Sequence, residues 1–210
     1  MKKIKTAIFL SGEETNFKSI YDTCLEKNCP FEIEIVISDR RCKGYDLSKS
    51  LNKKTYIFEN CEKITFEKKT NMVLKQNQID LICLAGFMKI LSEDFVKKWN
   101  KKILNIHPSI LPLFPGLNTY KKVIQYGMKI HGSTVHIVNS KVDSGPIIAQ
   151  SAITIDDLDN EISIEKKLKK SEHYLYPIAI KKYVIKTFFK NNKNSLKIEK
   201  NKYSNIIYSI

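Results

Sequence analysis

The sequence lacks closely spaced cysteines, and it has no run of apolar residues long enough to cross a membrane. Its five cysteines are scattered, without a Cys-x-x-Cys pair or a Cys/His cluster. This pattern indicates neither a disulfide framework nor a zinc site. The basic start is followed by a short apolar run and then by charge, which is unlike a signal peptide. We therefore expect a cytoplasmic protein without a membrane segment.

Arginine is almost missing. Of 36 basic residues only Arg40 and Arg41 are arginine, and the formal net charge is +14. Such a charge can attract nucleic acid, but arginine is the better residue for recognising phosphates and bases. A compositional bias toward Lys, Asn and Ile explains the charge at least as well. We therefore expect small-molecule partners, including anionic ones, and do not expect nucleic acid as the main partner.

Apolar runs alternate with helix-like segments through most of the 210 residues. This alternation predicts an α/β fold, with a mostly parallel central sheet flanked by helices. Strands are expected at 4–10, 31–38, 54–58, 79–85, 103–107, 133–138 and 146–155. Helices are expected at 16–27, 45–51, 64–76, 92–99, 119–126 and 162–189, the last kinked or split at Pro177. We expect one domain over 1–189 and a Lys/Asn-rich tail over 190–210, which is either mobile or an edge strand near 195–198.

Two polar residues end the strand predicted at 103–107. Asn105 and His107 lie two positions apart, so both side chains project to one face. They precede "PSILPLFPGLN" (108–118), here called the proline-rich loop, whose three prolines stiffen it. An amide beside an imidazole can stabilise charge on a carbonyl oxygen, as acyl transfer requires. A strand end whose polar residues bond the next turn is the equally weighted alternative.

Asp143 lies in a turn-like stretch, "KVDSGPI", before the next strand. A turn aspartate that bonds its own backbone is the favoured local interpretation. In the functional interpretation, its carboxylate lies near His107 and supports a protonated imidazole. We expect His136 to be structural within its strand, and His131 to be exposed in a loop.

Several longer stretches resemble one family. They are "LAGFMKILS" (84–92), "LNIHPSILPLFPGLNTYKK" (104–122), "HGSTVHIV" (131–138), "VDSGPIIAQ" (142–150) and "SEHYLYP" (171–177). Together they are similar to the glycinamide ribonucleotide formyltransferases, folate-dependent enzymes of purine biosynthesis within the formyltransferase superfamily. The resemblance covers about residues 4–185. It implies a Rossmann-like formyltransferase fold.

The resemblance also implies a catalytic trio of Asn105, His107 and Asp143. In that case the substrate amine attacks the formyl carbon of 10-formyltetrahydrofolate, and Asn105 with protonated His107 stabilises the oxyanion. Asp143 supports the imidazolium and helps to move the proton. No metal is implied. The residues implied to bind the donor are Lys63, Met88, Lys89, Ile90 and Leu91, together with Asn105 and Asp143.

The residues implied to bind the amine acceptor are Gly12, Glu14, Thr15, Asn16, Gly86, Lys169 and Glu172. Without the resemblance, Glu172 is better explained as a solvated helix residue. The opening stretch "SGEETN" departs from the family pattern Ser-Gly-x-Gly-Ser-Asn, because Glu14 replaces the second glycine. A carboxylate there opposes a bound phosphate by about 2–4 kcal/mol at 4–6 Å and partly screened dielectric. As an alternative, the glutamates only form an acidic first helical turn.

Three functions remain open at this point. The favoured one is formyl transfer to glycinamide ribonucleotide by an enzyme with an altered phosphate loop. The second is formyl transfer to a different amine, such as an amino sugar. The third is a non-catalytic, nucleic-acid-binding relative, against which the intact trio speaks. A monomer or weak homodimer is expected.

Overall fold

The computed structural model describes residues 2–13, 15–189 and 206–208. Their contacts cluster into two units, Met1–Asn105 and Ile106–Ile210. Glu14, the departure from the phosphate-loop pattern, lies outside the described residues.

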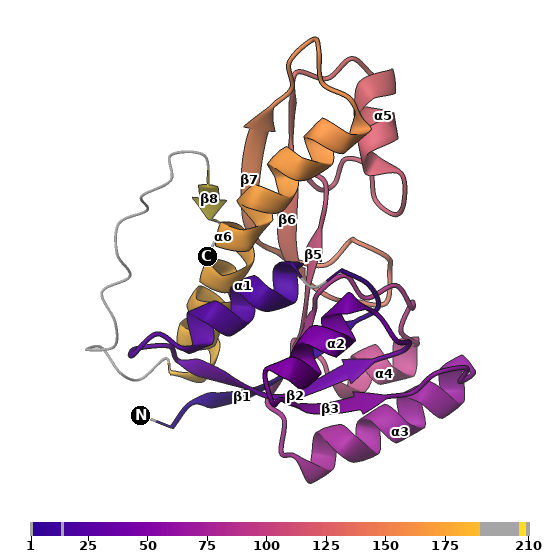
Figure 1. Ribbon diagram of the computed structural model, residues 1–210, viewed down its shortest axis with the longest axis vertical. Coiled ribbons are helices and arrows are strands. Elements are labelled where there is room, and N and C mark those ends of the chain that lie inside the picture. Colours follow the sequence, from indigo (N-terminus) through magenta and orange to yellow (C-terminus); the bar gives the residue numbers. More distant parts are fainter. Residues whose placement is uncertain (1, 14, 190–205, 209–210) are drawn as a thin grey trace. The chain divides into compact units, whose positions relative to one another are not determined.

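The first unit is built on a parallel sheet. Its strands, all shown in Figure 1, are β1 (Ile4–Leu10), β2 (Phe31–Ser38), β3 (Lys54–Ile57), β4 (Leu81–Leu84) and β5 (Ile103–His107), whose last two residues belong to the second unit. The spatial order is β3-β2-β1-β4-β5, and every neighbouring pair runs parallel. All of β4 and the last five residues of β1 are buried, as expected where a parallel sheet is covered on both faces.

Four helices connect these strands, namely α1 (Thr15–Cys24), α2 (Lys43–Ser50), α3 (Lys63–Gln76) and α4 (Glu93–Lys98). The start of α4 shows why the sequence forms a helix there. Ser92 is the N-cap, and its hydroxyl accepts a hydrogen bond from the Phe95 N–H at 3.1 Å. Glu93 and Asp94 in the first turn and Lys97 and Lys98 in the last suit the helix dipole.

The second unit contains α5 (Thr119–Gln125), β6 (Ile130–Ile137), β7 (Ile147–Thr154), α6 (Glu161–Phe188) and β8 (Ile206–Tyr208). Strands β6 and β7 form an antiparallel pair, and β8 pairs antiparallel with β7. The long helix α6 packs against β6 and β7, as Figure 1 shows. Its apolar side chains and those of the two strands form the core of this unit, which includes Val135, Ala149, Leu168, Leu175 and Ile180. Burial of a side chain the size of Val, Leu or Ile stabilises the fold by roughly 1.5–3 kcal/mol relative to full exposure.

The predicted α/β fold with a mostly parallel sheet is confirmed, and the antiparallel pairs of the second unit are its exception. Pro177 does not split the last helix, which runs without a break through Glu161–Phe188. The strand predicted at 195–198 lies outside the described residues, whereas a strand is present at 206–208.

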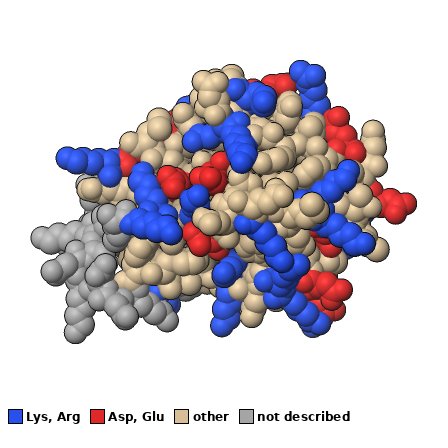
Figure 2. Space-filling model, turned by 90° about the horizontal axis from the view of Figure 1, so that it is seen from below, with Lys and Arg blue, Asp and Glu red and all other residues tan. Residues whose placement is uncertain are grey.

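On the face drawn in Figure 2, basic side chains lie in several separate groups with acidic side chains among them. A nucleic-acid-binding surface typically gathers its basic side chains into one patch or stripe. The arrangement on this face therefore does not favour that interpretation of the net charge.

Candidate active site

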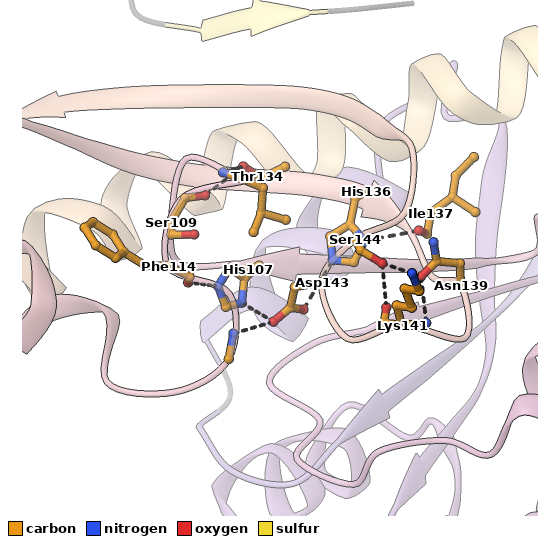
Figure 3. A network of polar contacts seen from close by, with 12 residues as sticks. His107, Ser109, Phe114, Thr134, His136, Ile137, Asn139, Lys141, Asp143 and Ser144 are labelled. Carbon is orange, nitrogen blue, oxygen red and sulfur yellow. Dashed lines mark hydrogen bonds and ion pairs between the residues drawn. The ribbon is translucent and has the colours of Figure 1, made fainter.

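The end of β5 and the loop between β6 and β7 bring two predicted residues together in the second unit. Nδ1 of His107 lies 3.3 Å from Oδ2 of Asp143, as Figure 3 shows. Asp143 has a φ of 49°, in the left-handed region that aspartate tolerates better than most residues. Both side chains are largely buried, so the attraction between them is weakly screened by water.

Asp143 has two further neighbours. Its Oδ2 accepts a hydrogen bond from the Gly116 N–H at 2.9 Å, and its Oδ1 lies 3.6 Å from Nε2 of His136. Burial by itself raises the pKa of this carboxyl group. The nearby His136 ring, the hydrogen bond from the Gly116 N–H and the nearby His107 together outweigh burial and lower the pKa below its ordinary value. Asp143 is therefore ionised at neutral pH.

His107 has an acceptor oxygen beside each ring nitrogen. Nε2 lies 3.0 Å from the carbonyl oxygen of Phe114, and Nδ1 faces the Asp143 carboxylate. Burial lowers the pKa of His107 below its ordinary value, while the Phe114 carbonyl and Asp143 oppose this shift. An imidazolium can donate to both oxygens, whereas a neutral ring can donate to only one. The site is thus arranged to stabilise a positive charge that forms on this ring during a reaction.

Within the second unit, a series of hydrogen bonds holds the proline-rich loop to strands β6 and β7. Thr134 on β6 donates from its hydroxyl to the Ser109 carbonyl at 2.7 Å, and the same hydroxyl accepts from the Leu111 N–H at 3.0 Å. Gln150 on β7 donates to the Leu111 carbonyl at 2.9 Å. Ser109 in turn donates to the Leu113 carbonyl at 2.6 Å. These bonds fix the backbone that leads to the carbonyl beside His107.

Asn105 precedes His107 by two residues on β5, so the alternation of the strand points both side chains to one face. Asn105 is half-buried and His107 is buried. The strand thus directs an amide and an imidazole to the same face of β5. This arrangement can stabilise the oxygen of a tetrahedral intermediate in acyl transfer.

Glu172 lies on α6 and is buried. This contradicts the alternative interpretation, in which Glu172 is a solvated helix residue. Its Oε1 accepts a hydrogen bond from the Ser133 hydroxyl on β6 at 2.8 Å. Burial, with Glu172 and Glu165 nearby, raises the pKa of Tyr120 on α5. Lys169, also predicted to contact the acceptor, forms an ion pair with Glu165 one turn earlier on α6, at 2.8 Å.

The expectation that His131 is exposed in a loop is wrong. It lies in β6 with only 1% of its surface exposed, and the ring of Tyr120 meets it edge-on at a centroid distance of 6.3 Å. Burial lowers the pKa of His131 to about 4, so the ring is neutral near pH 7. The local sequence places it before Gly132, which suggested a loop, but the strand begins at Ile130.

In the first unit, the opening loop after β1 contacts the start of α2. The Gly44 N–H donates to the Gly12 carbonyl at 3.1 Å, and Glu13 forms an ion pair with Lys43 at 3.1 Å. Thr15 is the first residue of α1. Asn16 follows it, and its carbonyl accepts a hydrogen bond from a serine hydroxyl one turn later. Gly12, Thr15 and Asn16 thus lie together at the N-terminus of a helix, where backbone N–H groups favour an anion.

Residues 86–91, here called the 86–91 loop, follow β4 in the same unit. Gly86 has a φ of +70°, a conformation that favours glycine. The Met88 N–H donates to the Ser11 hydroxyl at 2.9 Å, which joins this loop to the opening loop. Met88 and Ile90 remain 64% and 66% exposed, so this loop presents apolar side chains to its surroundings.

Two basic residues were predicted to bind the donor, Lys89 within this loop and Lys63 on α3. Lys89 lies with Nζ 5.8 Å from the ring centroid of Phe66. Lys63 is the first residue of α3 and is exposed, and Leu91 is half-buried.

Among the described residues, no group of three or more His, Cys, Asp or Glu side chains is placed to hold a metal ion.

The sequence did not point to three groups beside Asp143 and His107. They are His136, the Gly116 N–H and the Phe114 carbonyl. The short link between β6 and β7 was an available signal for His136, because it keeps Asp143 near the end of β6. No local pattern identifies the two backbone groups.

Comparison with known proteins shows the family to which the chain belongs. A family model described as formyl transferase matches residues 4–180. The chain belongs to the formyl transferase family. Among family members, it is 37% identical over 188 residues to phosphoribosylglycinamide formyltransferase of Haemophilus influenzae, and the match covers 86% of each chain. The solved phosphoribosylglycinamide formyltransferase of Brucella melitensis matches with a TM-score of 0.83 and 36% identity, over 87% of this chain and 96% of that one.

Other relatives are much longer. The chain is 37% identical over 183 residues to the human trifunctional purine biosynthetic protein adenosine-3, a match that covers 85% of this chain. It spans only 18% of that relative's length, and the same share of its chicken counterpart. Within the described residues, no helix has the length and apolar character needed to cross a membrane.

Proposed function

We propose that this chain transfers the formyl group of 10-formyltetrahydrofolate to the amine of glycinamide ribonucleotide, a step of purine biosynthesis. The observation that carries the proposal is the buried pair of His107 and Asp143, 3.3 Å apart. His107 lies on β5, the strand that also holds Asn105, and Asp143 lies in the loop between β6 and β7. Membership of the formyl transferase family supports the reaction class, and the two named phosphoribosylglycinamide formyltransferases support the acceptor.

In this proposal the three residues act on one tetrahedral intermediate. Asn105 donates a hydrogen bond to the oxygen of the formyl group as the acceptor amine attacks its carbon. His107 stabilises that oxygen through the charge of its imidazolium ring, because its two nitrogens already face the Phe114 carbonyl and Asp143. The negative charge on that oxygen favours the imidazolium form of His107, which Asp143 stabilises from the other side of the ring. Asp143 also assists proton movement from the attacking amine toward the departing nitrogen of the donor.

The binding residues follow the two loops of the first unit and helix α6. We assign the donor to side chains of the 86–91 loop and to one basic residue on α3, namely Met88, Lys89, Ile90, Leu91 and Lys63. Their apolar and cationic character suits a flat heterocycle with an acidic tail. We assign the acceptor to Gly12, Glu14, Thr15, Asn16, Gly86, Lys169 and Glu172, among which the α1 N-terminus suits its phosphate.

A transfer assay tests the proposal. Purified protein is incubated with 10-formyltetrahydrofolate and glycinamide ribonucleotide, beside Glu14→Gly and His107→Ala variants. We expect formyl transfer by the parent and at least a tenfold loss in the folded His107→Ala variant, which also excludes a contaminating enzyme. Activity only in Glu14→Gly would mean that Glu14 disables this copy. Donor binding without transfer by either protein would refute the acceptor, and absence of donor binding would refute the donor.

A further inference from the structure

Helix α3 holds both ends of the short helix α4 in the first unit. Glu67 and Asn71 lie one turn apart on α3. Glu67 bonds Ser92, the N-cap of α4, while the Asn71 side-chain oxygen accepts from the Trp99 indole N–H, at the C-cap, at 2.8 Å. Six helical residues are too few to be stable alone, so these contacts supply the order that α4 lacks.

The contact at Ser92 has two hydrogen bonds and an unusual setting. The Ser92 N–H donates to Oε1 of Glu67 at 2.6 Å, and the Ser92 hydroxyl donates to Oε2 at 2.5 Å. Glu67 is only 8% exposed. Because the hydroxyl proton is directed to Glu67, an oxygen lone pair remains for the Phe95 N–H that caps α4. Glu67 thus orients Ser92 both as a cap and as the end of the preceding loop.

That preceding segment is the 86–91 loop, which is fixed at several points. At its start, the Ala85 N–H donates to the Phe9 carbonyl at 2.8 Å. In the middle, the Phe87 ring packs on Phe66 at 5.7 Å, and the Met88 N–H bonds Ser11. At its end, Glu67 holds Ser92. After Met88 and before Ser92, no further backbone hydrogen bond to the loop is recorded within the described residues.

We propose that Glu67 is a positioning residue for the formyl donor, because it holds the end of the 86–91 loop in the conformation that the donor binds. This inference rests on the proposed function, in which that loop contacts the donor. Releasing Ser92 lets the stretch after Met88 sample other conformations. Donor binding must then order the loop again, which weakens affinity without touching the reacting atoms.

The test compares three variants at two positions one turn apart on α3, each of which contacts one end of α4. Glu67→Ala removes both bonds to Ser92. Glu67→Gln keeps an acceptor for the Ser92 N–H and a polar group beside the hydroxyl. Asn71→Ala breaks the bond at the other end of α4, on the same two helices, and leaves the loop contact intact. Steady-state kinetics with both substrates and backbone hydrogen exchange of the 86–91 loop are measured for each.

We expect Glu67→Ala to raise KM for 10-formyltetrahydrofolate at least fivefold, with KM for glycinamide ribonucleotide changed less than twofold and kcat within threefold. Exchange in the 86–91 loop should rise at least tenfold. Glu67→Gln should stay within twofold of the parent in donor KM. Asn71→Ala should also leave the donor KM unchanged, although it lowers thermal stability. If Glu67→Ala does not fold, Glu67→Asp, which retracts the carboxylate by one methylene, should show the same pattern.

Two results would overturn the inference. If Glu67→Ala and Asn71→Ala raise the donor KM equally, Glu67 only stabilises the helix pair. If loop exchange is unchanged in Glu67→Ala, it does not position the loop at all. Failure of the proposed function is distinguishable, because the parent itself would then show no transfer, while the exchange measurement would still decide whether Glu67 orders the loop.

Discussion

Replacing Asp143 with asparagine isolates the charge beside His107. Asparagine tolerates the left-handed backbone at this position and can still accept from the Gly116 N–H, so the loop should keep its conformation. What is lost is a negative charge 3.3 Å from Nδ1 of His107. At an effective dielectric of about 20–40, that charge stabilises an imidazolium by about 2–5 kcal/mol.

Part of this stabilisation is replaced by the amide dipole, so we expect a net loss of about 2–4 kcal/mol at the transition state. The loss corresponds to a fall in kcat of roughly 30- to 1000-fold. It should change KM for either substrate much less, because the charge acts on the intermediate.

The pH profile gives a second readout. Asp143 opposes the lowering of the His107 pKa, so its removal lowers that pKa further. Since the protonated ring stabilises the oxyanion, activity is lost as pH rises through this pKa. The loss should therefore begin at a lower pH in Asp143→Asn than in the parent. Initial rates of formyl transfer, measured with both substrates saturating between pH 5 and 9, record the shift.

Two outcomes would refute the reasoning. One is a folded Asp143→Asn protein with kcat within threefold of the parent and an unmoved pH profile. The other comes from the double variant with His107→Ala. If Asp143 acts through His107, adding Asp143→Asn to His107→Ala should slow the enzyme little further. A full additional loss would show that Asp143 acts independently.

Two further predictions concern stability and the loop geometry. His131 has a pKa of about 4 in the folded chain against an ordinary value of 6.5, so between these values the unfolded chain binds more protons and the protein loses stability as the pH is lowered. The free energy of unfolding should fall by about 2–3 kcal/mol between pH 7 and 4.5 from this residue, as urea titration can show, and His131→Gln should flatten that slope. At Gly145, an added Cβ would lie 1.7 Å from the Ile137 carbonyl oxygen, so Gly145→Ala must displace the Asp143 loop. We expect at least a tenfold lower kcat, and full activity would show that the loop position is unimportant.

The sequence predicted the helices and strands well, for reasons visible in particular segments. The β1 and β2 runs become continuously apolar in their second halves, at 7–10 and 35–37, where both faces are buried, and their predicted bounds match the structure. The hydroxyl of Ser92 followed by two acidic residues marked the start of α4. The predicted split at Pro177 was wrong, because packing on β6 and β7 keeps α6 continuous where an isolated helix would break.

The sequence also named the candidate site residues, since Asn105, His107 and Asp143 carry groups that can serve in acyl transfer, and the structure brings His107 and Asp143 together. Only the tertiary structure decided their surroundings. The Phe114 carbonyl comes from a loop whose course depends on how the chain turns back, not on any local pattern. The distance between His136 and Asp143 likewise depends on the conformation of the loop between β6 and β7. The buried contact between Glu67 and Ser92 joins residues 25 positions apart. Hydrophobic periodicity is a property of neighbours in sequence, whereas burial, pKa and hydrogen-bond partners depend on neighbours in space.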